Sequence, residues 1–217
     1  MSSREWVFKS RKLLSDPKLA SVVLRLMIVM NDIGLTNSQM FEWEKTEDPK
    51  KKLRARGAIL YFGRIQSAHL FEALSIIKEI TVDLELLKRV EQCDRRTVEA
   101  FRIVEAFIGS SDHDLLAMMR NVAAFHYEPK LSIRRLRSLV EKYPTHVSGI
   151  SMGSETLDWY FELGDVIIDG IVIRDVFGIG EEEDIKTGAL KVLDRLHVIG
   201  AALTNFAAYF IRDCCTK

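Results

Sequence analysis

The stretch from Asp114 to Tyr127 gathers several side chains of the types that can do acid–base and anion-binding chemistry. It holds a carboxylate at Asp114, a guanidinium at Arg120, an amide at Asn121 and an imidazole at His126. A guanidinium can bind a phosphate through two parallel hydrogen bonds. An imidazole titrates near neutral pH and can move protons during a reaction. Residues of these types could act together only if the fold brings their side chains into contact.

The order and spacing of these residues, in the segment Arg120-Asn-Val-Ala-Ala-Phe-His126, resemble the signature of the HEPN superfamily. That superfamily consists of all-α domains marked by an Arg, often followed by a polar residue such as Asn, and a His about four to six residues later. Asp114, six residues before Arg120, is similar to the aspartate of the ribonuclease-active kinase-extension branch. The resemblance covers roughly residues 10–145, and the remaining helices are similar to those of the larger, abortive-infection-linked members.

The resemblance implies metal-independent cleavage of RNA by a homodimer in which two copies of the motif form one composite cleft. Arg120 would hold the scissile phosphate, and His126 would move protons between the ribose 2′-hydroxyl and the leaving oxygen. Asn121 would orient His126 or a phosphate oxygen, and Asp114 would fix Arg120 or the tautomer of His126. The commonest small members place a Tyr two residues after the His, whereas Tyr127 follows it directly. This departure argues against tyrosine-modification chemistry here.

Helix geometry supports a structural alternative for the same residues. With about 100° between successive residues, a continuous helix would have an apolar side made of Leu115, Met118, Met119, Val122, Phe125 and His126. Arg120 and His126 would lie about 120° apart around the axis and about 9 Å apart along it. A functional site then requires the helix to loosen before His126, or a second protomer to complete the site. The alternative is a core histidine beside a solvated arginine.

A basic amphipathic helix is predicted directly after the motif, from Leu131 to Tyr143. Candidates for binding an RNA backbone are the basic residues Lys130, Arg134, Arg135 and Arg137. Cations beside a phosphate-handling site would attract the polyanion. The alternative is a solvated helix face that is balanced by acidic neighbours.

Other pairs of titratable residues point less clearly to chemistry. His69 and Glu72 share a helix face, but a di-metal bundle needs further carboxylates and a second such pair. A packed core histidine is the better interpretation, so no metal and no cofactor are expected. Asp165 and Asp169, one helical turn apart, are interpreted as caps or solvated charges.

The composition is that of a globular protein and excludes several classes. Of the 217 residues, 47% are hydrophobic and 29% charged, and 31 basic side chains balance 31 acidic ones. Zero net charge excludes a generally polycationic nucleic-acid binder but not a local basic patch. No membrane association is predicted, since the longest apolar stretch, Val198 to Ile211, is shorter than the about 20 residues that cross a bilayer. The few cysteines follow no framework spacing and favour a reducing, cytoplasmic environment.

Sparse chain breakers and repeated start signals predict long helices. The chain has 12 Gly and 4 Pro, and the Asp-Pro pairs at Asp16 and Asp48 are helix starts, with Asp as the N-cap and Pro at the first helical position. Further helices are expected at residues 4–14, 81–92, 94–108, 112–127, 131–143, 157–177 and 186–213. The segment 157–177 is rich in β-branched residues, but no second strand is available to pair with it, so it is predicted as a helix.

The expected fold is therefore one all-α domain over residues 1–217, an antiparallel helical bundle. A HEPN-like core would cover residues 10–145, and additional helices would follow at 146–217. Two functions fit this fold. The first is a cytoplasmic, homodimeric endoribonuclease used in defence or as a toxin, with RNA as substrate and a protein partner or antitoxin. The second is a catalytically silent helical module that binds a protein or a nucleotide through the same cleft.

Overall fold

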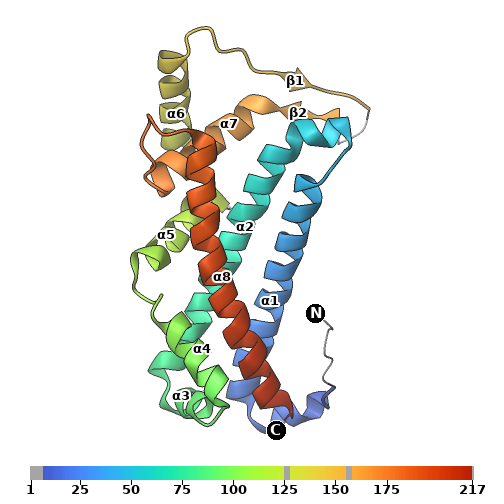
Figure 1. The fold of residues 1–217 in the computed structure, drawn as a ribbon, viewed down its shortest axis with the longest axis vertical. Helices are drawn as coiled ribbons and strands as arrows, with labels where there is room; N and C mark the ends of the chain where they lie inside the picture. Colours follow the sequence, from blue (N-terminus) through green and yellow to red (C-terminus); the bar gives the residue numbers. More distant parts are fainter. Residues whose placement is uncertain (1–6, 125–127, 155–157, 217) are drawn as a thin grey trace. The chain divides into compact units, whose positions relative to one another are not determined.

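The computed structural model describes residues 7–124, 128–154 and 158–216, and this part of the chain is all-α apart from one short strand pair, which confirms the predicted fold class (Figure 1). The long helices are α1 (Pro17–Glu44), α2 (Pro49–Val82) and α8 (Ile185–Thr216). The shorter helices are α3 (Leu84–Glu91), α4 (Arg95–Glu105), α5 (Ser111–Met119), α6 (Pro129–Lys142) and α7 (Glu162–Gly170).

Several turns and one strand pair complete the described chain. A 3₁₀ turn spans Ser10–Ser15, and π-helical turns span Arg120–Ala124 and Ile171–Val176. The strands β1 (Ile150–Ser151) and β2 (Tyr160–Phe161) pair antiparallel, with Ile150 opposite Phe161. β1 lies in a stretch for which no helix is predicted, whereas β2 lies near the start of the segment 157–177, which is predicted as a helix. The hairpin is too short to change the fold class.

The helix starts lie where the Asp-Pro pairs predict them. Asp16 precedes α1, and its Oδ1 accepts a hydrogen bond from the backbone N–H of Leu19 at 3.1 Å. Asp48 precedes α2, and its Oδ1 accepts from the N–H of Lys51 at 3.4 Å. These side chains satisfy backbone donors that have no partner inside the helix. Proline at the first helical position removes one further donor.

The predicted helices differ from the observed ones where a local signal interrupts a periodic pattern. The helix expected at 81–92 is divided at Asp83, whose Oδ1 accepts from the N–H groups of Glu85 and Leu86 at 3.0 and 3.2 Å. The helix expected at 4–14 is a 3₁₀ turn within its described part. The segment 157–177 is helical, as predicted, over Glu162–Gly170, and it then widens into the second π turn.

The chain forms two compact units. Unit 1 contains Met1–Gly34, His69–Asp114 and Arg195–Lys217, and unit 2 contains Leu35–Ala68 and Leu115–Asp194. The helices α1, α2, α5 and α8 each contribute residues to both units. The single domain over residues 1–217, with a HEPN-like core at residues 10–145, stays a prediction.

Unit 1 has an extensive apolar core. The rings of Phe101 on α4, Phe206 and Phe210 on α8 form a continuous series, in which neighbouring centroids lie 5.2 Å apart. Leu74 and Ile77 from α2 are fully buried in the same unit. Each side chain of this size contributes about 1.5–3 kcal/mol when it is removed from water. The stability of unit 1 therefore rests chiefly on aromatic and aliphatic packing.

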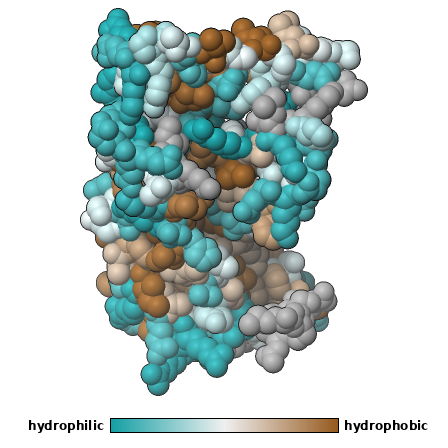
Figure 2. Space-filling view, turned by 45° about the horizontal axis from the view of Figure 1, so that its top comes forward, coloured by the Kyte–Doolittle hydropathy of each residue, from teal (hydrophilic) through white to brown (hydrophobic). Residues whose placement is uncertain are grey.

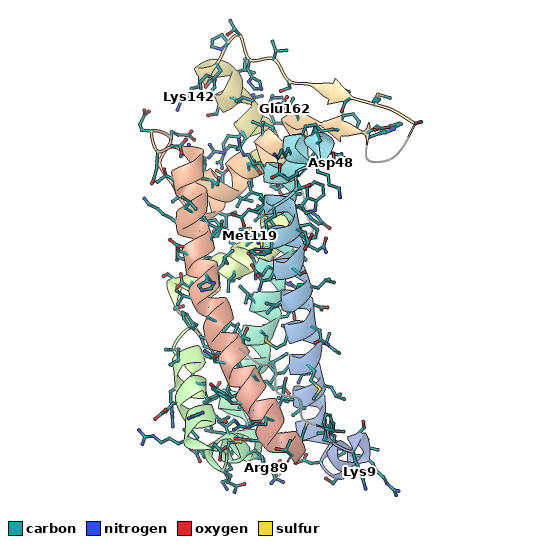
Figure 3. The ribbon with its side chains drawn as sticks, turned by 45° about the vertical axis from the view of Figure 1, so that its right-hand side comes forward. Lys9, Asp48, Arg89, Met119, Lys142 and Glu162 are labelled. Carbon is teal, nitrogen blue, oxygen red and sulfur yellow. The ribbon has the colours of Figure 1, made fainter. Side chains whose placement is uncertain are left out.

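Unit 2 has a smaller core in which both π turns take part. Met119, at the end of α5, packs with Ala123 of the first π turn and with Ile168 of α7. Ile171, Val172 and Val176 of the second π turn complete this cluster. Met119, labelled in Figure 3, is only 1% exposed. The core of unit 2 thus fixes the inner sides of the two irregular turns.

Helix α1 is long and apolar enough to cross a membrane by length and composition alone. Core helices of proteins without a membrane pass the same test, and Val22, Val23 and Leu26 of this helix are fully buried within unit 1. The sequence analysis did not identify this helix as a membrane candidate.

Candidate functional site

The predicted phosphate-binding motif lies at a break in regular helix. Helix α5 ends at Met119, and the next five residues, Arg120–Ala124, form a π turn. Such turns are rare and occur often at functional sites. Arg120 and Asn121 are exposed, and Nη1 of Arg120 lies 3.4 Å from Oδ1 of Asn121. The π turn therefore presents a guanidinium and an amide together, while Ala123 and Ala124 anchor its inner side.

A buried arginine supports the π turn from beneath. Arg64 of α2 is only 7% exposed, and its Nη1 donates a hydrogen bond to the backbone oxygen of Ala123 at 3.1 Å. A charged donor forms a stronger hydrogen bond than a neutral one. The carbonyl oxygen of Ala123 thus accepts from a side chain, and this contact fixes the backbone of the turn.

The structure places only some of the predicted catalytic residues. His126 lies outside the described residues, so its position relative to Arg120 stays a prediction. Asp114 is exposed in the first turn of α5, where a carboxylate is favourable near a helix N-terminus. Asp114 belongs to unit 1, whereas Arg120 and Asn121 belong to unit 2. Arg120 and Asn121 are thus the two members of the predicted set that the structure brings together.

The basic residues after the motif divide into two kinds. Lys130 and Arg137 are exposed on α6. Arg135 binds Asp175 through Nε and Nη2 at 2.6 and 2.7 Å, and it also binds Glu181. Hydrogen bonding to Asp175 raises the pKa of Arg135 above its usual value, against the opposing effect of burial. Arg134 binds Asp175 too, so Arg134 and Arg135 lie beside acidic neighbours, as the alternative interpretation of this helix face expects.

Asp169 of α7 is a buried acid, and its interpretation as a cap or a solvated charge is wrong. It is only 2% exposed, and its Oδ2 lies 3.1 Å from Nη2 of Arg56. Burial raises the pKa of Asp169 to about 7. The positive charges of Arg56 and Arg64 lower this pKa, and the negative charge of Asp165 raises it. A carboxyl group that titrates near neutral pH inside a fold is a common mark of a functional site.

Asp165, one turn before Asp169, is held in place by its surroundings. Tyr160 of β2 forms a side-chain hydrogen bond with Asp165. Burial, followed by the nearby carboxylates, raises the pKa of Tyr160, so its hydroxyl remains a donor at neutral pH. On the other side, the carboxylate of Asp165 occupies the space that a Cβ at Gly57 would need. Glycine is costly inside a helix, and here it allows α7 to approach α2.

A cleft of about 750 Å³ lies beside Asp165 and Arg64 within unit 2. Its walls are mostly apolar, with Ile133 and Leu136 from α6, Ile150 and Phe161 from the hairpin, and Leu163 and Ile167 from α7. Ligand sites in proteins have volumes of about 300–1,000 Å³ and combine apolar walls with a few polar groups. Ile150 and Phe161 are 71% and 52% exposed, and Figure 2 shows that apolar surface, in brown, alternates with hydrophilic surface, in teal.

A second cleft of unit 2, about 760 Å³ in volume, has a structural explanation. It lies beside Arg56, Lys142, Arg174 and the acidic turn that follows the second π turn. Nη2 of Arg174 donates to the backbone oxygen of Glu183 at 2.6 Å, and Nζ of Lys142 donates to that of Glu181 at 3.0 Å. Arg174 and Lys142 therefore hold the acidic turn in place by donating hydrogen bonds to its backbone carbonyl oxygens.

No group of three or more His, Cys, Asp or Glu side chains that could hold a metal ion lies within the part of the chain that the structure describes. His69 has a structural partner instead, since its Nδ1 lies 3.6 Å from Oδ2 of Asp32. No known protein family, curated protein or solved structure matches this chain.

Arg64 was not identified from the sequence and Asp169 was misinterpreted, although a signal for each exists. Arg64 occupies a position between Leu60 and Leu74 in the apolar register of α2, and Asp169 lies three residues before Val172 in the apolar register of its own helix. A charged residue at an apolar position of an amphipathic helix is either buried with a partner or disturbs the packing of that helix face. Both residues are buried here, and each has a partner of suitable chemistry.

Proposed function

We propose that the protein is a metal-independent endoribonuclease of HEPN type in which Arg120 binds the scissile phosphate and His126 transfers protons. The observation that carries the proposal is the π turn at Arg120–Ala124. A continuous α-helix would hold the two side chains about 120° apart. A π turn takes five residues between bonded groups instead of four. This departure from regular α-helix supports the proposal, because the motif requires the helix to loosen before His126.

The chemistry needs a phosphate clamp and two proton transfers. The ribose 2′-hydroxyl gives its proton to a neutral imidazole, and its oxygen attacks the adjacent phosphorus. The bond from phosphorus to the 5′ oxygen breaks, and that oxygen takes a proton from a protonated imidazole. Arg120 stabilises the charge that develops on the phosphate oxygens. The products are a 2′,3′-cyclic phosphate and a 5′-hydroxyl end.

A homodimer would supply both imidazoles. Two-fold symmetry places the same patch of both chains at one interface, so two copies of a half-site can form one cleft. The proposal therefore includes a symmetric dimer with the two Arg120 side chains near the axis. Lys130 and Arg137, exposed on α6, would contact the RNA backbone on either side. A role in defence or as a toxin, restrained by an antitoxin, belongs to the same proposal.

The deciding experiment is incubation of the purified protein with total RNA in the presence of EDTA. Cleavage should continue and should leave 2′,3′-cyclic phosphate ends. His126→Ala should lower the rate by about 10²- to 10⁴-fold, and Arg120→Lys should also be damaging because an ammonium group lacks the planar fork. His197→Ala and Arg96→Lys change exposed residues of the same types and serve as matched controls. Activity that disappears in EDTA but survives His126→Ala would contradict the mechanism.

Sedimentation at micromolar concentration tests the dimer. A monomer, or a dimer joined only through α8, would remove the composite site.

The cleft of unit 2 favours a second candidate, a catalytically silent module that binds a ligand. The specific observation is the pair Arg64 and Asp165 on walls that are mostly apolar. A folded protein that cleaves no RNA, and whose His126 does not react with diethyl pyrocarbonate, would favour this candidate.

A further inference from the structure

Two residues of opposite charge line the mostly apolar cleft of unit 2. Asp165 and Arg64 both line it, and the remaining walls come chiefly from aliphatic side chains and from the ring of Phe161. In such a cleft a carboxylate accepts hydrogen bonds and a guanidinium donates them. The cleft therefore suits a flat ligand that has donors on one part of its edge and acceptors on another.

Both charged groups are held before any ligand arrives. The hydrogen bond from Tyr160 and the close approach to Gly57 fix Asp165. Arg64 is 7% exposed, and its bond to the carbonyl oxygen of Ala123 fixes the guanidinium. A guanidinium has about five N–H donors, so it can bind that carbonyl and a ligand together. Fixed polar groups reduce the loss of conformational freedom on binding.

We infer that this cleft binds a guanine base of the RNA substrate, with Asp165 accepting hydrogen bonds from N1–H and the N2 amino group and Arg64 donating to O6 or N7. Guanine is the base whose edge offers two adjacent donors beside an acceptor pair, and an arginine on O6 and N7 is the commonest specific contact to it. Adenine and cytosine would place a ring-nitrogen acceptor against the carboxylate. Uracil would offer the carboxylate one donor.

The apolar walls fit the faces of such a base. Single-stranded RNA is recognised by bases that leave the stack and lie against aromatic or apolar side chains, with hydrogen bonds to their edges. Phe161 supplies a ring, and Ile133 and Leu136 supply aliphatic surface. The exposure of Ile150 and Phe161 at the hairpin leaves the cleft open to an incoming base.

Arg64 connects the cleft to the proposed site of cleavage. It lines the cleft and also binds the backbone of the π turn that begins at Arg120. A base held by Arg64 would thus adjoin the turn that binds the phosphate. The inference rests on the proposed function for its substrate, and it names the nucleotide that the same site prefers.

The test is binding of the four ribonucleosides to the full-length protein by isothermal titration calorimetry. Guanosine should bind, and adenosine, cytidine and uridine should bind at least about 10-fold more weakly. Asp165→Asn should weaken guanosine binding by about 10- to 100-fold, because an amide would turn its donor or its single acceptor toward N1–H and N2. Asp194→Asn, which changes an exposed aspartate of unit 2, is the matched control and should bind like the wild type.

Gly57→Ala tests the site without removing any polar group. The new methyl group would displace the carboxylate of Asp165, while alanine favours the helix. Guanosine binding should fall although the protein stays folded by circular dichroism. Gly63→Ala is the control, because it adds a methyl group to the same helix where no atom lies within 4 Å.

The outcomes separate this inference from the proposed function. Cleavage that depends on His126, without preference for guanosine in the binding experiment, would overturn the inference alone. Equal binding of adenosine, or unchanged guanosine binding in Asp165→Asn, would overturn it as well. Guanosine binding that depends on Asp165, in a protein that cleaves no RNA, would support the base site and reject the nuclease.

Discussion

Asp213 of unit 1 and Asp169 of unit 2 are both buried, at 5% and 2% exposure, but their surroundings are opposite in kind. Burial by itself raises the pKa of either carboxyl group. At Asp213 this effect is outweighed by hydrogen bonds from the N–H of Asp94 at 2.9 Å, from Arg212 at 2.7 Å and from the hydroxyl of Thr97 at 2.8 Å. The pKa of Asp213 therefore lies below its usual value.

At Asp169 the balance is reversed. Arg56 lies 3.1 Å away, but its side chain is 57% exposed, and the repulsion from Asp165 adds to the effect of burial. The two buried carboxyl groups thus differ in how well their surroundings stabilise the charged form. Asp213 joins α8 to the start of α4 and accepts hydrogen bonds on both carboxylate oxygens, as expected of a structural contact. Asp169 is buried with a pKa raised to about 7, and a buried carboxyl group of this kind is a common mark of a functional site.

The largest expected effect is that of Asp213→Ala on stability. Removal of the carboxylate would leave the backbone N–H of Asp94 and the hydroxyl of Thr97 without their acceptor, while Arg212 would keep its bond to Asp94. At about 1–3 kcal/mol for each buried polar group left without a partner, the loss should be about 3–5 kcal/mol in the free energy of unfolding. Urea denaturation checks this value, with Asp194→Ala, an exposed aspartate on the same helix, as the control. A loss below about 1 kcal/mol would mean that Asp213 is not a structural contact.

The pH dependence of stability tests Asp169. Its pKa of about 7 in the folded protein lies above the ordinary value of 3.8. Between these two values the folded protein keeps a proton that the unfolded chain releases, so stability should fall as the pH rises. At about 1.4 kcal/mol per pKa unit, this decrease is on the order of 2–4 kcal/mol from acid to pH 8.

Asp169→Asn should remove this decrease, because the amide keeps the shape of the side chain but does not titrate. Unfolding free energies at pH 5 and pH 8 measure the difference between variant and wild type. Asp213 should act in the opposite direction at lower pH, since a depressed pKa gives stability that is lost as the pH falls through it. Identical pH profiles for the wild type and Asp169→Asn would refute the assignment of Asp169.

The smallest expected effect compares two glycines of α2. Gly63→Ala should stabilise the protein by about 0.5–1 kcal/mol, because alanine favours the helix and the space around Gly63 is open. Gly57→Ala should yield less than this, since the new methyl group must displace Asp165. Thermal unfolding of the two variants measures the difference. Equal gains would show that the contact between Gly57 and Asp165 is unimportant.

Local signals in the sequence were sufficient to predict the fold class and most helix starts. An Asp-Pro pair specifies a start through bonds within a single turn, as at Asp16 and Asp48, and no distant contact is needed. The short hairpin was not predicted, because two residues in each strand carry too little periodic pattern. Its position depends on tertiary contacts, such as the bond from the N–H of Gly149 to Glu162 at 2.9 Å.

The site could be predicted only in part for the same reason. The motif identified Arg120 and Asn121, which the structure places together at an exposed turn. The π turn that presents them depends on the bond from Arg64, which is 59 residues away from Ala123 in the chain. Asp169 was misinterpreted because spacing alone does not distinguish a buried acid from a solvated one.

The two π turns have a consequence for how this chain can tolerate changes of length. In the second turn, the N–H of Phe177 donates to the oxygen of Val172 at 3.0 Å, five residues earlier. Deletion of one residue between Ile171 and Val176 would restore the four-residue bond of an α-helix and rotate everything that follows by about 100°. Asp175 would then turn away from Arg134 and Arg135. Single-residue deletions in these turns should therefore be far more harmful than most substitutions there, and related chains that keep the site should keep the residue count.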